Sequence, residues 1–211
     1  MQDLTAHIPA FLSAYAILLV AALAPGPAVA MLLGLGLSRG RGAAMVATLG
    51  IAAGSVVLNL VTMLGVGLLL QQAAWAMQGL KLAGAGYLAW LSFKAFRRAA
   101  NPPAIDAAPV AARGLRDGFV AGLLLQVTNP KAIVFWLAIA AVGATTGGGL
   151  VTHAAFVLGA FLITLTCHAG WALVLSSGPV RAAYQHARAR VEATLGAFFA
   201  FFAYKLATEK L

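Results

Sequence analysis

Charge is scarce in this chain of 211 residues: 9% of them are charged, against about 25% in an ordinary soluble domain. The acidic residues number five, and each lies in a tail, in a loop or at the end of an apolar segment: Asp3, Asp106, Asp117, Glu192 and Glu209. A membrane enzyme that works through Mg²⁺ and phosphates needs clustered carboxylates, and an intramembrane protease needs a carboxylate pair. Neither arrangement is present, so the sequence argues against an enzyme.

Cysteine is almost absent. The single Cys167 excludes an internal disulfide and a cysteine-rich metal site, and no HExxH or CxxC motif occurs. We therefore expect neither a metal nor a cofactor. The net charge of +9 does not indicate a nucleic-acid partner, because in a chain this apolar the position of each charge matters more than their sum.

Hydrophobic residues are abundant, at 62% of the chain, and the mean hydropathy is +0.93. A spanning helix needs about 20 apolar residues, and the sequence predicts six such segments, at about 8–37, 44–70, 75–94, 118–142, 151–176 and 191–208. The first lacks the basic leader of a signal peptide, so we interpret it as a retained span. The expected fold is a single all-α membrane domain over residues 1–211, with the lipid bilayer as its environment.

Basic residues indicate the orientation. Ten of the 14 lie in three alternate connections: Arg39 and Arg41 in the first, Lys94, Arg97, Arg98, Arg113 and Arg116 in the third, and Arg181, Arg188 and Arg190 in the fifth. The connections at 71–74 and 143–150 have none. Because positively charged loops stay in the cytoplasm, both termini are predicted to face the outside.

The longest connection, at about 95–117, divides the chain into two halves of three helices, at about 1–100 and 118–211. An odd number of spans makes the second half enter from the opposite side, which predicts an inverted repeat. Each half has a proline break in its first helix, at Pro25–Pro27 and at Pro130. Glycines spaced by four, at Gly50/Gly54 and Gly118/Gly122, predict close helix packing.

These two breaks are the candidate substrate site, because broken helices at membrane depth survive only where protein or a cavity surrounds them. At the first break, Pro25, Gly26 and Pro27 release backbone groups that either meet a substrate carboxylate or serve a packing kink. At the second, Asn129 either binds a ligand or makes a structural hydrogen bond between helices. Lys131, after Pro130, either holds a substrate carboxylate or pairs with carbonyls of the broken helix.

Three runs of residues resemble the LysE/RhtB type of amino-acid exporters: PGPAVAMLLGLGLSRGRGAAMVATLGIAAGS, KLAGAGYLAWLSFKAFR and NPKAIVFWLA. The resemblance covers nearly the whole chain in order. It implies efflux of amino acids or similar small metabolites across the bacterial inner membrane, driven by proton antiport with alternating access. The alternative is a passive channel or a structural membrane subunit, and the oligomeric state stays open between a monomer and a homodimer.

Proton coupling has two candidate residues, Lys131 and His168, of which His168 is read more simply as a packing residue near the membrane interface. Secondary polar candidates are Ser55, Asn59, Gln126 and Lys81. Ser55 and Asn59 are four apart on one helical face, where a hydrogen-bond stripe between helices is favoured over substrate contact. Lys81 is expected to extend its amine toward the membrane surface.

Overall fold

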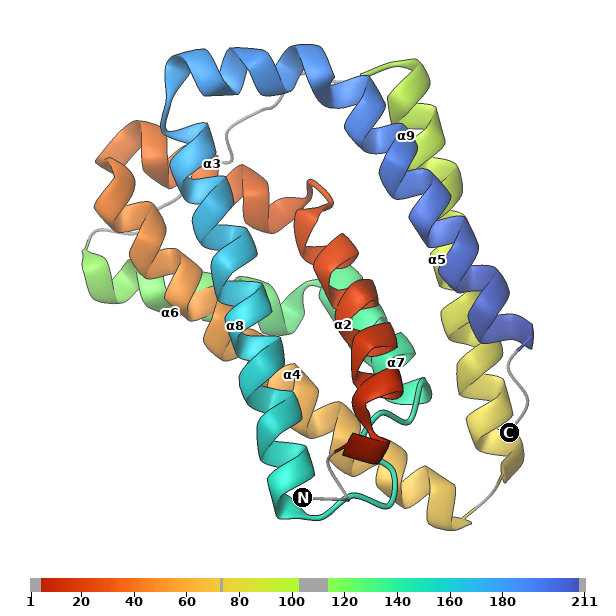
Figure 1. The fold of residues 1–211 in the computed structure, drawn as a ribbon. Coiled ribbons are helices and arrows are strands. Elements are labelled where there is room, and N and C mark those ends of the chain that lie inside the picture. The colour runs from red at the N-terminus through yellow and green to blue at the C-terminus, as the bar shows by residue number, and fades with distance from the viewer. Residues whose placement is uncertain (1–4, 73, 103–113, 209–211) are drawn as a thin grey trace.

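The structure is a computed structural model that describes residues 5–72, 74–102 and 114–208. In these residues it is all-helical, with eight helices and no strand (Figure 1). They are α2 (Ile8–Leu23), α3 (Pro27–Arg39), α4 (Arg41–Gln72), α5 (Ala74–Ala100), α6 (Leu115–Thr128), α7 (Pro130–Ala141), α8 (Leu150–Leu175) and α9 (Gly178–Thr208).

Both proline breaks form as the sequence predicts, and for the same reason. A residue before proline prefers extended backbone, and Ala24 and Asn129 end α2 and α6 in that conformation. Proline suits the first position of a helix, where no backbone donor is needed, and Pro27 and Pro130 begin α3 and α7 there. The chain bends by 48° at the first break and by 59° at the second.

Four segments are long and apolar enough to cross a membrane. These are residues Arg41–Gly65 of α4, all of α8, and the two bent pairs α2–α3 and α6–α7, each taken as one span. All six expected segments are helical, but α5 and α9 do not meet the same criterion of length and composition. The fifth connection was predicted to be a loop up to residue 190; this is wrong, because α9 is helical from Gly178.

The helices of the two halves pack across one another. In the first half, α4 packs against α6 and α7 of the second; in the second half, α8 packs against α2 and α3 of the first. The remaining helices, α5 and α9, run side by side, after the first part of α9 has crossed one end of the molecule (Figure 1). A hydrogen bond of 2.8 Å from Ser92 Oγ to the Gly196 carbonyl joins these two.

Large apolar side chains cover the outer surface. Leu64 and Val151 are each 72% exposed, and Leu150 is 86% exposed. Exposed apolar area on this scale would promote aggregation in water, whereas hydrocarbon solvates it. The exterior therefore fits a protein that lies in a bilayer.

The expected close packing at glycine is found between α4 and α6, but not at every predicted position. A Cβ atom on Gly122 would lie 2.2 Å from the Ala47 carbonyl oxygen, and one on Gly50 would lie 2.0 Å from that of Phe119. A Cβ atom on Gly118 would keep an ordinary distance of 3.7 Å from its nearest neighbour. The contact thus requires glycine at positions 50 and 122, while position 118 has room for alanine.

This difference gives a matched pair of substitutions one helical turn apart. Gly122→Ala should lower the melting temperature of the detergent-purified protein markedly, because the added methyl forces two backbones apart, typically by about 1–3 kcal/mol for overpacking. Gly118→Ala should leave the melting temperature within a degree or two. Equal behaviour of the two variants would contradict the proposed backbone contact.

Candidate functional site

The two proline breaks, more than a hundred residues apart in the sequence, line one central cavity. Its wall includes Ala24, Gly26 and Pro27 from the first break, and Asn129 and Lys131 from the second. Pro25 and Pro130 set the backbone at each break but are not part of the wall. The tertiary fold therefore brings together the two features that the sequence singled out.

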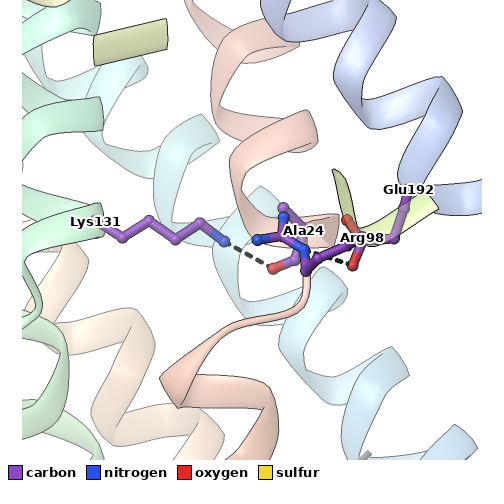
Figure 2. Close-up of polar contacts among 4 residues, drawn as sticks. All are labelled: Ala24, Arg98, Lys131 and Glu192. Atoms are coloured by element: carbon purple, nitrogen blue, oxygen red, sulfur yellow. Dashed lines mark hydrogen bonds and ion pairs between the residues drawn. The ribbon is translucent and has the colours of Figure 1, made fainter. Parts of the chain in front are cut away.

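Lys131 bridges the two breaks. Its Nζ donates a hydrogen bond of 2.7 Å to the carbonyl oxygen of Ala24, the residue between α2 and the first break (Figure 2). A Cβ atom on Gly26 would lie 3.4 Å from Nζ, at the edge of ordinary van der Waals contact. The amine of the second break therefore packs directly against the backbone of the first. Of the two alternatives for Lys131, pairing with the broken helix is the contact seen in this arrangement.

The carbonyls at the end of α2 are hydrogen-bonded by side chains of the other half. The last turn of a helix leaves carbonyl groups without partners inside the helix. Trp171 Nε1 on α8 donates to the Ala22 carbonyl at 3.3 Å, and Lys131 donates to Ala24. Two carbonyls at the first break are therefore hydrogen-bonded by residues from the second half.

Asn129 stabilises the second break locally. Its Oδ1 accepts a hydrogen bond of 3.0 Å from the backbone N–H of Lys131, which makes Asn129 the N-cap of α7. Asparagine is among the preferred residues at this position. The structural hydrogen bond expected for Asn129 exists, but within its own segment instead of between helices.

Polar groups from three other helix segments complete the wall. Gln126 Nε2 on α6 donates to Ser55 Oγ on α4 at 2.7 Å, so Ser55 makes the predicted hydrogen bond between helices. Thr164 is 1% exposed, and its hydroxyl has no partner among the described residues. His168, one turn further along α8, points Nδ1 at the Thr164 carbonyl at 2.9 Å. A carbonyl only accepts, so Nδ1 carries the hydrogen and Nε2 stays available.

His168 lies inside the helix bundle. It is 6% exposed and lines the central cavity. Asn59, in contrast, lies outside this site: it lines a second cavity, and its side chain makes no hydrogen bond within the described residues. Lys81 belongs to α5, but its side chain is outside the part of the chain that the structure describes.

Sequence reasoning missed an ion pair close to the site. Arg98 Nε on α5 contacts Glu192 Oε1 on α9 at 2.9 Å (Figure 2). The Glu192 side chain is fully buried, and both residues interact electrostatically with Lys131. The sequence placed Glu192 at the end of an apolar segment, which is correct, but α9 begins earlier than predicted and its fold buries this carboxylate. An acidic residue at the start of an otherwise apolar segment was the available signal.

No group of three His, Cys, Asp or Glu side chains in the described ranges is arranged to hold a metal ion. The wall of the cavity instead offers one amine, two amides, two hydroxyls and one imidazole among apolar side chains. Such a set suits a small polar organic molecule that is held by hydrogen bonds and one charge.

Comparison with known proteins agrees with this geometry. Residues 19–210 match the LysE type translocator family. The chain belongs to the LysE type translocator family. Its members are translocators, not enzymes, and the central cavity of this LysE-family chain lies almost wholly within the matched region.

Several curated relatives cover most of the LysE-family chain. The threonine efflux protein of Escherichia coli (strain K12) is 29% identical over 91% of this chain and 94% of its own length. The threonine efflux protein of Salmonella typhi is 31% identical over the same shares. The chemotactic transduction protein ChpE of Pseudomonas aeruginosa is 34% identical over 60% of this chain and 64% of its own length. No solved structure matches this chain significantly.

Proposed function

We propose that this translocator exports an amino acid or a closely related small metabolite from the cytoplasm, and that the central cavity is its binding site. The convergence of both proline breaks on one cavity, bridged by Lys131 and Ala24, carries the proposal. Paired interruptions in two halves are the feature by which transporters form a site at mid-membrane. Relatives along most of the chain are named threonine efflux proteins, so L-threonine is the first substrate to test.

The polar groups of the wall complement an amino acid. A lysine ammonium has three N–H donors, and one of them bonds the Ala24 carbonyl, which leaves two for a substrate carboxylate. The unpartnered hydroxyl of Thr164 and the Ser55–Gln126 pair face the same space. These groups can bond the substrate ammonium and a polar side chain, with Phe135 and Trp136 as the apolar wall.

The volume of the central cavity indicates which conformational state the structure represents. Its volume of about 40 Å³ accommodates a few water molecules, each of which needs roughly 10–15 Å³ measured in this way, but no amino acid. Substrate entry therefore requires the two breaks to separate and the Lys131–Ala24 hydrogen bond to open. We interpret the structure as a closed state of an alternating-access cycle.

Proton antiport is the proposed coupling, with Lys131 and His168 as the candidate carriers. Both line the cavity, and they come from different helices, α7 and α8. Antiport requires the carrier residue to take up a proton from outside as the substrate leaves, and to release it to the cytoplasm as the next substrate binds. A proton taken up in the cavity adds a positive charge that repels the substrate ammonium, so proton uptake and substrate release would occur at one place.

The proposed topology has six spans in two inverted repeats, with both termini outside the bacterial inner membrane. The packing between the two halves supports the repeat. In the first half, α4 packs on α6 and α7, the broken helix of the second half; in the second half, α8 packs on α2 and α3, the broken helix of the first. Pseudo-twofold symmetry would produce this relationship, and it would pair α5 with its counterpart α9. The helices α5 and α9, which do not meet the length and composition criterion for a span, would therefore occupy equivalent positions in the two repeats.

Counterflow in proteoliposomes tests the proposed function. Vesicles that contain this protein and a high internal concentration of unlabelled L-threonine should accumulate external labelled L-threonine above equilibrium. A carrier exchanges its substrate in this way, whereas a channel only equilibrates it. Accumulation that never exceeds equilibrium, for L-threonine and for a panel of the other amino acids, would contradict a carrier.

The topology is tested by single cysteines in a Cys167→Ala background. Ala100→Cys, at the end of α5, should react with a membrane-impermeant maleimide only from the cytoplasmic side. Leu150→Cys, at the start of α8, should react only from outside; both positions are exposed. Labelling of both from one side would rule out this topology.

A further inference from the structure

A second cavity lies next to the central one and is not part of the binding site proposed above. Its volume is about 290 Å³, close to the lower end of the roughly 300–1,000 Å³ typical of small-molecule sites. The wall comes from α4, α7, α8 and the connection between α7 and α8. Its polar side chains are Asn59, Thr62, Thr145, Thr146 and His153, and Trp136 contributes an indole. The cavity is thus large enough for an amino acid.

Asn59 is the unusual residue of this wall. It is 1% exposed, and neither its amide oxygen nor its amide nitrogen has a hydrogen-bond partner in the part of the chain that is described. A buried amide without partners is destabilising, and such groups are rare in folded proteins. An occupant of the cavity would provide the missing partners.

Trp136 separates the two cavities. It is 2% exposed and lines both of them. On α4, Ser55 faces the central cavity, and Asn59, one helical turn further, faces the second. The second cavity includes Gly143–Gly147, in the connection that has no basic residue and is proposed to face outside. A molecule moving outward from the centre would therefore meet Trp136 and then Asn59.

The chemistry of the second cavity selects a molecule with no net charge. No Asp, Glu, Lys or Arg lines it, and its one titratable residue, His153, bonds the Gly149 carbonyl of its own helix through Nδ1 at 2.9 Å. Burial of a net charge in such surroundings would be costly. A zwitterionic amino acid is neutral overall, and the Asn59 amide offers an acceptor for its ammonium and a donor for its carboxylate.

We propose that the second cavity is an outer binding site for a zwitterionic amino acid, separated from the central site by Trp136. This inference rests on the proposed function, since the ligand is the exported substrate. The outer site would receive the amino acid after it leaves Lys131 and before it leaves the protein. Trp136 must move for this transfer, so the side chain acts as the partition between the two sites.

Binding stoichiometry tests the outer site. Purified protein in nanodiscs is titrated with tritiated L-threonine by equilibrium dialysis; the wild type should bind two molecules per chain and Asn59→Leu one. Leu58→Met, a swap of similar volume on the same helix but outside both cavities, is the control and should keep both. Asn59→Leu should fold, because removal of an unpartnered buried amide is not expected to destabilise; an unchanged or raised melting temperature checks this.

The outcomes distinguish this inference from the proposed function. A wild-type protein that shows counterflow but binds one molecule per chain would overturn the outer site and leave the exporter intact. Two bound molecules in a folded Asn59→Leu variant would also overturn it. Loss of all binding and counterflow in the wild type would overturn both proposals. Retention of one molecule by both Asn59→Leu and Lys131→Met would support two separate sites.

Discussion

Lys131→Met should reduce gradient-driven export of L-threonine to the level of vesicles without protein. The substitution removes the cation proposed to hold the substrate carboxylate, and it removes the 2.7 Å hydrogen bond to the Ala24 carbonyl. That carbonyl then lacks a partner in the closed state, at a cost of about 1–3 kcal/mol. Export is measured in proteoliposomes with an imposed pH gradient, at equal amounts of reconstituted protein.

Lys205→Met is the matched control. Lys205 also donates a hydrogen bond from a partly buried position, to Ser13 Oγ at 2.9 Å, but it lies away from the central cavity. Normal export by this variant would show that loss of a bonded lysine is tolerated elsewhere. Normal export by Lys131→Met itself would remove Lys131 from the mechanism.

Lys131→Arg separates binding from coupling. Arginine keeps the positive charge but does not release its proton under physiological conditions. Counterflow should therefore persist, at least in part, while export driven by the pH gradient should fall strongly. Full proton-coupled export by the arginine variant would exclude deprotonation at position 131 and leave His168 as the candidate carrier in this cavity.

Local sequence signals predicted the helices and the breaks well. Proline acts on its own backbone and on the residue before it, so Pro27 and Pro130 determine where α3 and α7 begin whatever surrounds them. The apolar segments were equally clear, because about 20 apolar residues are needed to span hydrocarbon. The start of α9 was predicted wrongly because residues 178–190 include several polar and basic side chains. Hydropathy does not distinguish such a polar helix from a loop.

The contacts between the two halves could not be predicted from the sequence. The sequence identified Lys131 as a residue with two interpretations, but its partner Ala24 lies 107 positions away and has no polar side chain to mark it. The same holds for Trp171, whose indole bonds the Ala22 carbonyl. Backbone carbonyls are identical along a chain, so only the three-dimensional arrangement shows which of them are exposed at a break.

Burial was also misjudged where a residue lies at a segment end. The acidic residues were interpreted as peripheral, yet Glu192 is fully buried between α5 and α9. Hydropathy averages over a whole segment and does not show which face of the helix is buried. The buried face of α9 contains both Glu192 and apolar residues such as Phe199, whereas its outer face contains exposed residues such as Phe201.

Arg98→Gln should be the most destabilising single change at this pair. Removal of one partner from a buried ion pair typically costs about 3–5 kcal/mol, because an uncompensated charge stays behind. The Glu192 side chain is fully buried, while that of Arg98 is 29% exposed. Loss of Arg98 therefore strands a carboxylate away from water, whereas Glu192→Gln leaves a guanidinium that water still reaches.

The two variants should consequently differ in melting temperature, measured on detergent-purified protein, with Arg98→Gln clearly the lower. Arg97→Gln is the control, because Arg97 is the exposed neighbour on the same helix, and surface changes rarely exceed about 0.5 kcal/mol. The double variant Arg98→Gln/Glu192→Gln should regain much of the loss, since neither member of the pair is left as a charge without its partner. A double variant as unstable as Arg98→Gln would mean that Glu192 is neutralised by another group, and the asymmetry in burial would then not explain the stability of the α5–α9 pair.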